Sequence, residues 1–130
     1  MPVRELRLVV TAPDYEEALV FYRDVLGLPV RAVFESPDGH VTLLDAGRAT
    51  LELLDATHAE AVDRIEVGRR VAGRVRLALE VEDSAAMSER LQEAGATHIA
   101  GPVVTPWQHS NVRLEAPDGT QLTLFTVLDT

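Results

Sequence analysis

Two short stretches of the chain share one pattern, and this repeat decides the expected fold. Residues 6–14 read LRLVVTAPD and residues 75–83 read VRLALEVED. Each has an arginine at its second position, Arg7 or Arg76, and an aspartate at its last, Asp14 or Asp83. Alternating apolar residues predict a strand, and the aspartate is a good N-cap for a helix that follows. The sequence therefore predicts the same strand-to-helix transition twice, 69 residues apart.

The residues that follow each copy extend the repeat. We expect a first strand at 3–10, a helix that Gly27 ends, and strands at 28–36, 40–46 and 49–55. In the second copy we expect a strand at 73–83, a helix at 84–96 and three strands, at 97–106, 111–117 and 120–127. The prediction is an α+β fold of two tandem βαβββ units, residues 1–56 and 72–130, in a half-open curved sheet around a central cleft. The polar segment 57–71 is expected to link them and has room for one short helix.

Composition narrows the functional classes. The chain has no cysteine, which excludes disulfides, thiolate metal sites and cysteine nucleophiles. Its formal charge of −9 repels phosphate backbones, so a nucleic-acid partner is not expected. The first ten residues do not read as a signal peptide, and no apolar run reaches the ~18 residues that a membrane span needs. We therefore expect a cytoplasmic protein without a membrane partner.

Four segments carry a resemblance to a known family: DYEEALVFYRDVLGL (14–28), LELLD (51–55), LALEVEDSAAMSERLQEAGA (77–96) and APDGTQLTLF (116–125). With them the chain resembles the vicinal oxygen chelate superfamily, which includes glyoxalase I, extradiol dioxygenases and bleomycin-resistance proteins. One departure is Ala116, where relatives commonly have an aspartate before PDG. In character the chain is most similar to the metal-independent antibiotic-binding members.

The resemblance also says where a metal would lie in the enzymes of that family, with one ligand on each of four strands. By the family's spacing these positions fall on Arg7, Glu52, Arg76 and Thr123. Of the four, only Glu52 can ligate strongly, because a guanidinium stays protonated and offers no lone pair. We therefore expect no metal and no other cofactor. A non-standard metal site that combines His109 with Glu52 stays open as an alternative.

Alternation and the resemblance together predict a pocket that mixes apolar surface with a few charges. Trp107 stands in a proline-marked loop, where it could stack on a flat or cationic ligand or instead plug a dimer interface. Arg7 and Arg76 could pair with Glu52 and Glu80, or bind an anionic or carbonyl oxygen of a ligand. The predicted ligand-binding residues are Arg7, Val9, Glu52, Leu54, Arg76, Trp107, His109, Asn111, Thr123 and Phe125.

The leading functional hypothesis is a metal-independent, non-catalytic binding protein. The resemblance implies a homodimer that traps an aromatic or polycyclic natural product, as the antibiotic-sequestering members do. The alternative is a glyoxalase-like lyase or isomerase, or a dioxygenase, that uses Glu52 as a general base or a bound divalent metal. A protein-interaction module has little support, because no long apolar stripe or charge block stands out.

Overall fold

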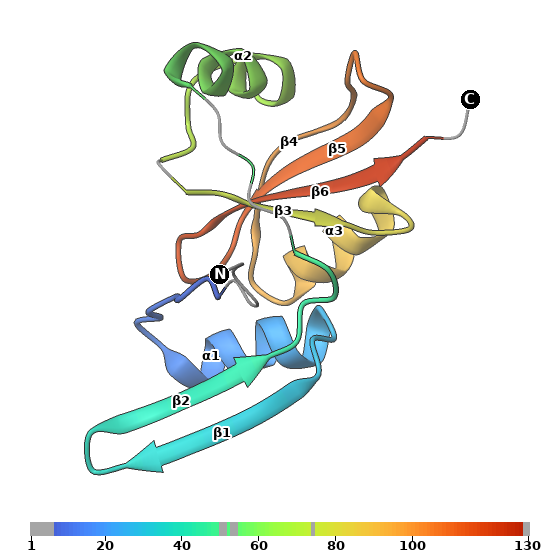
Figure 1. Cartoon of the computed structure of the whole chain (residues 1–130). Helices are drawn as coiled ribbons and strands as arrows, with labels where there is room; N and C mark the ends of the chain where they lie inside the picture. The colour runs from blue at the N-terminus through green and yellow to red at the C-terminus, as the bar shows by residue number, and fades with distance from the viewer. Residues whose placement is uncertain (1–6, 50–51, 53–54, 74, 129–130) are drawn as a thin grey trace, which may run out of the picture. The chain divides into compact units, whose positions relative to one another are not determined.

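The computed structural model describes residues 7–49, 52, 55–73 and 75–128. The chain divides into two compact units, Met1–Glu52 and Leu53–Thr130, and each is described by itself. Figure 1 shows the helices and strands of both units along the chain. No helix within the described residues is long and apolar enough to cross a bilayer.

The first unit contains a helical segment followed by a β-hairpin. Helix α1 (Tyr15–Leu19) continues as a π-helical segment (Val20–Val25). The Asp14 carboxylate accepts the backbone N–H of Glu17 at 3.0 Å, which confirms the predicted N-cap. Gly27 follows the helix with a φ of +79°, in the left-handed region that glycine adopts without cost. The helical start and end were thus correctly predicted.

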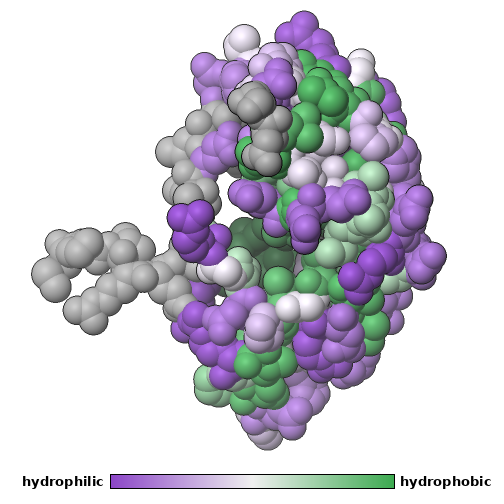
Figure 2. Space-filling view, turned by 90° about the vertical axis from the view of Figure 1, so that its right-hand side faces the viewer, coloured by the Kyte–Doolittle hydropathy of each residue, from purple (hydrophilic) through white to green (hydrophobic). Residues whose placement is uncertain are grey.

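The hairpin joins β1 (Val30–Ser36) to β2 (Gly39–Leu44) in antiparallel register. It lies close to the predicted strands 28–36 and 40–46. Three of its large apolar side chains, Val33, Phe34 and Val41, are more than half exposed. Figure 2 shows one face of the molecule, where hydrophobic residues (green) form patches among hydrophilic ones (purple).

The strand predicted at residues 3–10 is not found in its described part. Residues 7–10 belong to no strand, and Val9 is 85% exposed. A strand needs a neighbour to accept its backbone hydrogen bonds, and alternation alone does not supply one. Residues 3–6 and most of the strand predicted at 49–55 lie outside the described residues.

The second unit has the predicted order of strand, helix and three strands. These elements are β3 (Leu77–Glu80), α3 (Ser84–Glu93), β4 (Thr97–Val104), β5 (His109–Glu115) and β6 (Gln121–Val127). The sheet order is β3-β6-β5-β4; β3 runs parallel to β6, and the other neighbours are antiparallel. The Asp83 carboxylate accepts the backbone N–H of Ala86, so the second predicted N-cap is also confirmed.

One further helix, α2 (Ala56–Glu66), precedes this order and falls within the segment expected to be a polar linker. Asp55 caps it by accepting the backbone N–H of His58 at 2.8 Å. The helix contacts β4 and β5, whereas α3 contacts β4, β5 and β6 (Figure 1). The unit boundaries expected at residues 56 and 72 stay a prediction.

The sheet of the second unit has one apolar and one polar face. Alternate residues of β5 and β6 share a face, and the apolar set is fully buried with Leu91 of α3: Val112, Leu114, Leu122 and Leu124. Ser84 of α3 anchors this side, because its hydroxyl donates to the Ser110 carbonyl and its N–H donates to Thr126 Oγ1. The other face meets acidic side chains of α2.

Backbone packing is tight where β4 crosses β5. Gly101 has a φ of +98°, and a Cβ atom built on it would lie 2.5 Å from the carbonyl oxygen of Asn111. Both the left-handed φ and the close approach require glycine here. The register of β4 against β5 shifts on this stretch, between Ala100 and Val103. Gly101 therefore lies at an irregularity within one strand.

Candidate functional site: a buried polar cluster under helix α2

The polar face of the sheet is built by alternate residues of the two central strands. Asn111 and Arg113 lie on β5, and Thr123 lies on β6 directly opposite Arg113 in the register. All three are buried, although a buried arginine is rare unless it is paired. We call these three residues, together with Asp63 and Glu66 of α2, the polar cluster.

Arg113 is the centre of the polar cluster and is 0% exposed. Its Nη1 donates to Asp63 Oδ1 at 2.8 Å and its Nη2 donates to Glu66 Oε1 at 3.2 Å. Its Nε donates to Thr123 Oγ1 at 3.1 Å. Each guanidinium nitrogen therefore has an acceptor, which a buried charge requires if it is not to destabilise the fold.

Asp63 is held as a carboxylate although it is buried. Its Oδ2 accepts the backbone N–H groups of Val71 and Ala72, at 2.8 and 2.9 Å, and Nη1 of Arg70 at 2.7 Å. Burial raises the pKa of Asp63, but these hydrogen bonds and the one from Arg113 outweigh burial and bring the pKa below its ordinary value. Asp63 therefore stays charged throughout the neutral range and ties the chain after α2 to the helix.

Glu66 receives three donors from the sheet. Its Oε1 accepts Thr123 Oγ1–H at 3.0 Å as well as Arg113 Nη2, and its Oε2 accepts Nδ2 of Asn111 at 3.2 Å. The amide orientation of Asn111 follows from chemistry, because a carboxylate can only accept and must face the NH₂ group. The other amide atom, Asn111 Oδ1, is buried and has no hydrogen-bond partner among the described residues.

Arg76, predicted as a site residue, reaches the edge of this cluster. Its Nη1 donates to Thr123 Oγ1 at 2.7 Å, so this hydroxyl accepts from two arginines and donates to Glu66. Arg76 directly precedes β3, which runs parallel to β6 and pairs Ala78 with Thr123. Two of the predicted site residues, Arg76 and Thr123, are therefore hydrogen-bonded to each other.

An aromatic pair lies on the same strands. The rings of His109 and Phe125 stack with centroids 5.1 Å apart and planes 14° from parallel. Phe125 lies opposite Asn111 in the register, so its side chain shares the polar face. Trp107, in the preceding loop, is 42% exposed. The structure thus brings His109, Asn111 and Phe125 together, and it presents the Trp107 ring at the surface of the same unit.

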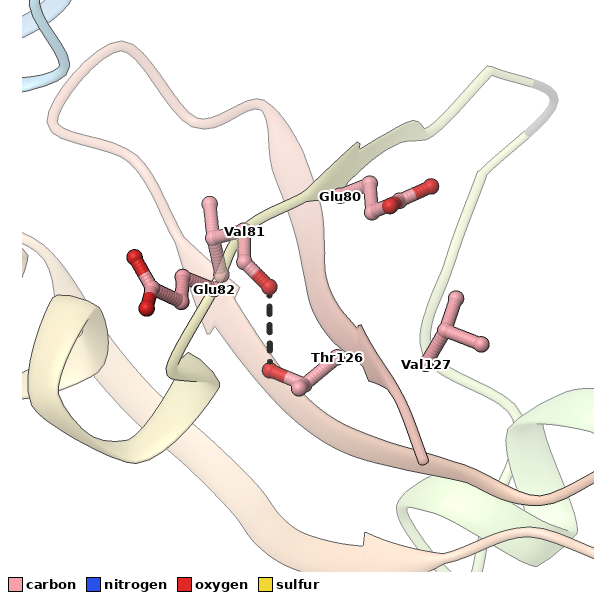
Figure 3. Close-up of a pocket in the computed structure, with 5 residues that line it drawn as sticks. All are labelled: Glu80, Val81, Glu82, Thr126 and Val127. Carbon is pink, nitrogen blue, oxygen red and sulfur yellow. Dashed lines mark hydrogen bonds between the residues drawn. The ribbon is translucent and has the colours of Figure 1, made fainter. Parts of the chain in front are cut away.

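A shallow pocket lies where β3 and β6 end. It is lined by Glu80, Val81, Glu82, Thr126 and Val127. The hydroxyl of Thr126 donates to the Val81 carbonyl at 3.1 Å (Figure 3). The carboxylates of Glu80 and Glu82 point away from each other in Figure 3, so they do not form a paired-carboxylate site.

The remaining predicted site residues do not belong to the described part of the second unit. Arg7, Val9 and Glu52 belong to the first unit, where all three are exposed. Leu54 lies outside the described residues. The pairing of Arg7 with Glu52 stays a prediction.

With this geometry established, the chain can be compared with known proteins. Residues 6–124 match the model of the Glyoxalase/Bleomycin resistance protein/Dioxygenase superfamily. The chain belongs to this superfamily. The resemblance inferred from the sequence is thereby confirmed.

The members of the superfamily that are similar to this chain include lactoylglutathione lyases and an antibiotic binding protein. A probable lactoylglutathione lyase from Synechocystis sp. (strain ATCC 27184 / PCC 6803 / Kazusa) is 26% identical over 92% of each chain. TnmS3, an antibiotic binding protein from Streptomyces sp. CB03234, is 26% identical, with a TM-score of 0.64 over 98% of this chain and 99% of TnmS3. A glyoxalase/bleomycin resistance protein from the same Streptomyces strain is 28% identical, with a TM-score of 0.55 over 88% and 93% of the two chains.

The metal that enzymes of this superfamily hold does not fit the residues of the second unit. Two of the four positions expected for ligands carry Arg76 and Thr123, and the Thr123 hydroxyl already has three hydrogen-bond partners. A guanidinium cannot ligate a cation and repels it at short range. Within the described part of the chain, no group of three or more histidine, cysteine, aspartate or glutamate side chains is placed to hold a metal ion.

Sequence reasoning missed three members of the polar cluster: Asp63, Glu66 and Arg113. A signal for Arg113 was present, because strand alternation puts it on the same face as Asn111. Asp63 and Glu66 are spaced i, i+3 and so share one face of any helix through this segment. The sequence predicts this segment as a polar linker, and a linker gives its acids no specific partners among the arginines of the sheet.

Proposed function

We propose that this chain is a small-molecule binding protein that traps an aromatic or polycyclic compound and does not transform it. The observation that carries the proposal is the hydrogen bond between Arg76 and Thr123. It joins side chains at two positions where the spacing of the superfamily would put metal ligands. A guanidinium cannot ligate a metal, and the Thr123 hydroxyl already has three hydrogen-bond partners. A chain with the superfamily's architecture but with these two residues at the ligand positions is best suited to binding a small molecule.

The aromatic side chains of the second unit support this kind of ligand. The His109–Phe125 stack and the exposed Trp107 ring offer flat surfaces, and flat aromatic ligands gain from stacking on such rings. The similarity to TnmS3, which binds an antibiotic, points the same way at 26% identity. The formal charge of −9 favours a neutral or cationic compound over a polyanion. A homodimer is part of this proposal.

A fluorescence titration tests the proposal. Trp107 is the only tryptophan, so its emission reports on ligands that bind near its loop. We expect at least one member of a panel of polycyclic natural products to change this emission saturably, to raise the melting temperature, and to be recovered unchanged. A panel that changes neither emission nor melting temperature would count against the proposal.

The second candidate function is a glyoxalase-like lyase, favoured by the lactoylglutathione lyases at 26–27% identity. In this version Glu52 acts as a general base next to a substrate carbonyl. The substitution Glu52→Gln separates the two functions. It should abolish turnover in an enzyme, but should only weaken affinity in a binding protein. Lactoylglutathione formation by the wild-type protein, lost in Glu52→Gln, would establish the lyase.

A further inference from the structure

We propose that Asn111, Arg113 and Thr123 form an oxyanion subsite for the ligand, and that Glu66 is a built-in competitor for it. This inference rests on the proposed function and names a chemical group that the ligand would carry. The group is an oxyanion, such as a carboxylate or a phenolate, with a hydroxyl beside it.

The first argument is the way in which the sheet holds Glu66. Three donors on two adjacent strands converge on one carboxylate: Arg113 Nη2 at 3.2 Å, Asn111 Nδ2 at 3.2 Å and Thr123 Oγ1 at 3.0 Å. Arg113 is fixed independently by its bonds to Asp63 and Thr123, so it does not need Glu66 in order to stay in place. A preorganised set of donors of this kind binds any oxyanion of suitable size.

The second argument is the unsatisfied atom beside the carboxylate. Asn111 Oδ1 is buried without a hydrogen-bond partner in the described part of the chain, and such atoms destabilise a native fold unless something satisfies them. Glu66 cannot satisfy it, because a carboxylate has no proton to donate. A ligand with an oxyanion next to an O–H group can accept from the three donors and donate to Asn111 Oδ1. Glu66 therefore fills the three donors of the subsite but leaves the acceptor Asn111 Oδ1 unsatisfied.

Helix α2 has little fully buried apolar surface. Val62 is the buried apolar side chain of the helix, and its other two buried residues are the charged Asp63 and Glu66. Segments with little buried apolar area open at low free energy compared with the core of a fold. A ligand oxyanion that takes the place of Glu66 would also keep the charge around Arg113 balanced. Asp63 and its bonds to Val71 and Ala72 can stay intact during this exchange.

A comparison of Glu66→Gln with the wild type tests the inference by calorimetric titration. The probe is 1-hydroxy-2-naphthoate, and its neutral counterpart is 1-hydroxy-2-naphthamide. Because a neutral amide at position 66 competes for the three donors more weakly than a carboxylate does, we expect the acid to bind Glu66→Gln roughly tenfold more tightly than the wild type. The amide should bind both proteins alike. Glu60→Gln, on the exposed side of the same helix, is the matched control and should behave as the wild type does.

A second variant keeps the inference testable if Glu66→Gln does not fold properly. Glu66→Ala leaves the three donors without their carboxylate, and propionate is small enough to replace it. We expect propionate to raise the melting temperature of Glu66→Ala by several degrees, whereas propionamide should not and the wild type should not respond. No selective response to propionate would overturn the inference.

The outcomes separate this inference from the proposed function. If the wild type binds members of the natural-product panel but Glu66→Gln gains no preference for the acid, the oxyanion subsite is wrong and the binding function stands. If the panel, the acid and the amide all fail to bind, the binding function is wrong and the subsite is overturned with it.

Discussion

Arg76 and Thr123 are hydrogen-bonded to each other, Nη1 to Oγ1, at 2.7 Å. They are 47 residues apart in the chain: Arg76 directly precedes β3, and Thr123 lies on β6, which runs parallel to β3. In a superfamily whose enzymes hold a metal near these positions, the bond places a permanent positive charge and a neutral hydroxyl there instead. The same hydroxyl links Arg76 to Arg113 and Glu66, so Arg76 is connected to the buried polar cluster.

The first prediction concerns the stability that depends on Arg113. Arg113→Met leaves the buried carboxylates of Asp63 and Glu66 without their shared partner. Removal of one partner from a buried ion pair typically costs about 3–5 kcal/mol of unfolding free energy, and we expect a loss of this size. Urea unfolding at neutral pH measures it. Arg23→Met, which breaks an exposed pair with Asp24, is the control and should leave the urea midpoint nearly unchanged.

The second prediction concerns the pH dependence that Asp63 gives to stability. Its pKa in the folded chain lies below the ordinary value, so the unfolded chain takes up a proton at Asp63 first as the pH falls. The stabilisation is fully present above the unfolded pKa of about 3.9 and is lost as the pH falls toward the folded pKa. We expect the unfolding free energies of wild type and Asp63→Asn to differ by a constant amount from pH 5 to pH 7 and to converge below about pH 4. Urea unfolding of both proteins at each pH provides the comparison, and a difference that stays constant down to pH 3 would contradict the assignment.

Local sequence signals predicted the two helices that follow Asp14 and Asp83. Asp14 and Asp83 cap their helices through the backbone N–H three residues on, as the sequence pattern requires. These signals succeed because the contacts that they describe lie within one turn of helix. The second unit followed its predicted order for a similar reason, since apolar residues alternate with polar ones along β5 and the first half of β6.

Contacts between distant segments were harder to predict. The run that contains Val9 alternates as a strand does, yet its described part has no strand neighbour to pair with. Asp63 meets Arg113 across 50 residues of chain, and Glu66 meets Thr123 across 57. Sequence spacing says which side chains share a helix face, but not which sheet face that helix covers. The sequence pattern indicates that Asn111 and Arg113 share a strand face, whereas their acidic partners on α2 were identified only in the structure.

The third prediction concerns the close approach of β4 to β5. Gly101→Ala introduces a Cβ atom 2.5 Å from the carbonyl oxygen of Asn111 and forces alanine to adopt a φ of +98°. Disfavoured backbone conformations cost on the order of 1–3 kcal/mol, and the clash adds to this. We expect Gly101→Ala to lower the melting temperature clearly. Gly47→Ala is the matched control, because its φ of +68° is also left-handed but nothing lies within 4 Å of the added atom. Equal losses in the two variants would show that the contact with Asn111 does not matter.

The fourth prediction concerns added metal. Because Arg76 cannot ligate a cation and the Thr123 hydroxyl already has three hydrogen-bond partners, we expect that excess zinc, nickel, manganese or iron(II) leaves the melting temperature unchanged. We also expect metal analysis of the purified protein to find no stoichiometric divalent ion. A stoichiometric metal that EDTA removes with a fall in melting temperature would contradict the proposed binding function. It would instead favour the metal-dependent alternative.

The last prediction concerns the stacked pair of His109 and Phe125. Phe125→Leu keeps a large apolar side chain on the polar face but removes the ring that stacks on His109. Stacking between aromatic rings contributes about 0.5–1.5 kcal/mol beyond the area that it buries. If the ligand is flat and extends this stack, its affinity should fall by roughly 2- to 13-fold in Phe125→Leu. Calorimetric titration with a panel compound that binds the wild type measures the change. Phe34→Leu, at an exposed site on β1, is the control and should bind as the wild type does. An unchanged affinity in Phe125→Leu would place the ligand away from this ring pair, even if Trp107 emission still responds to it.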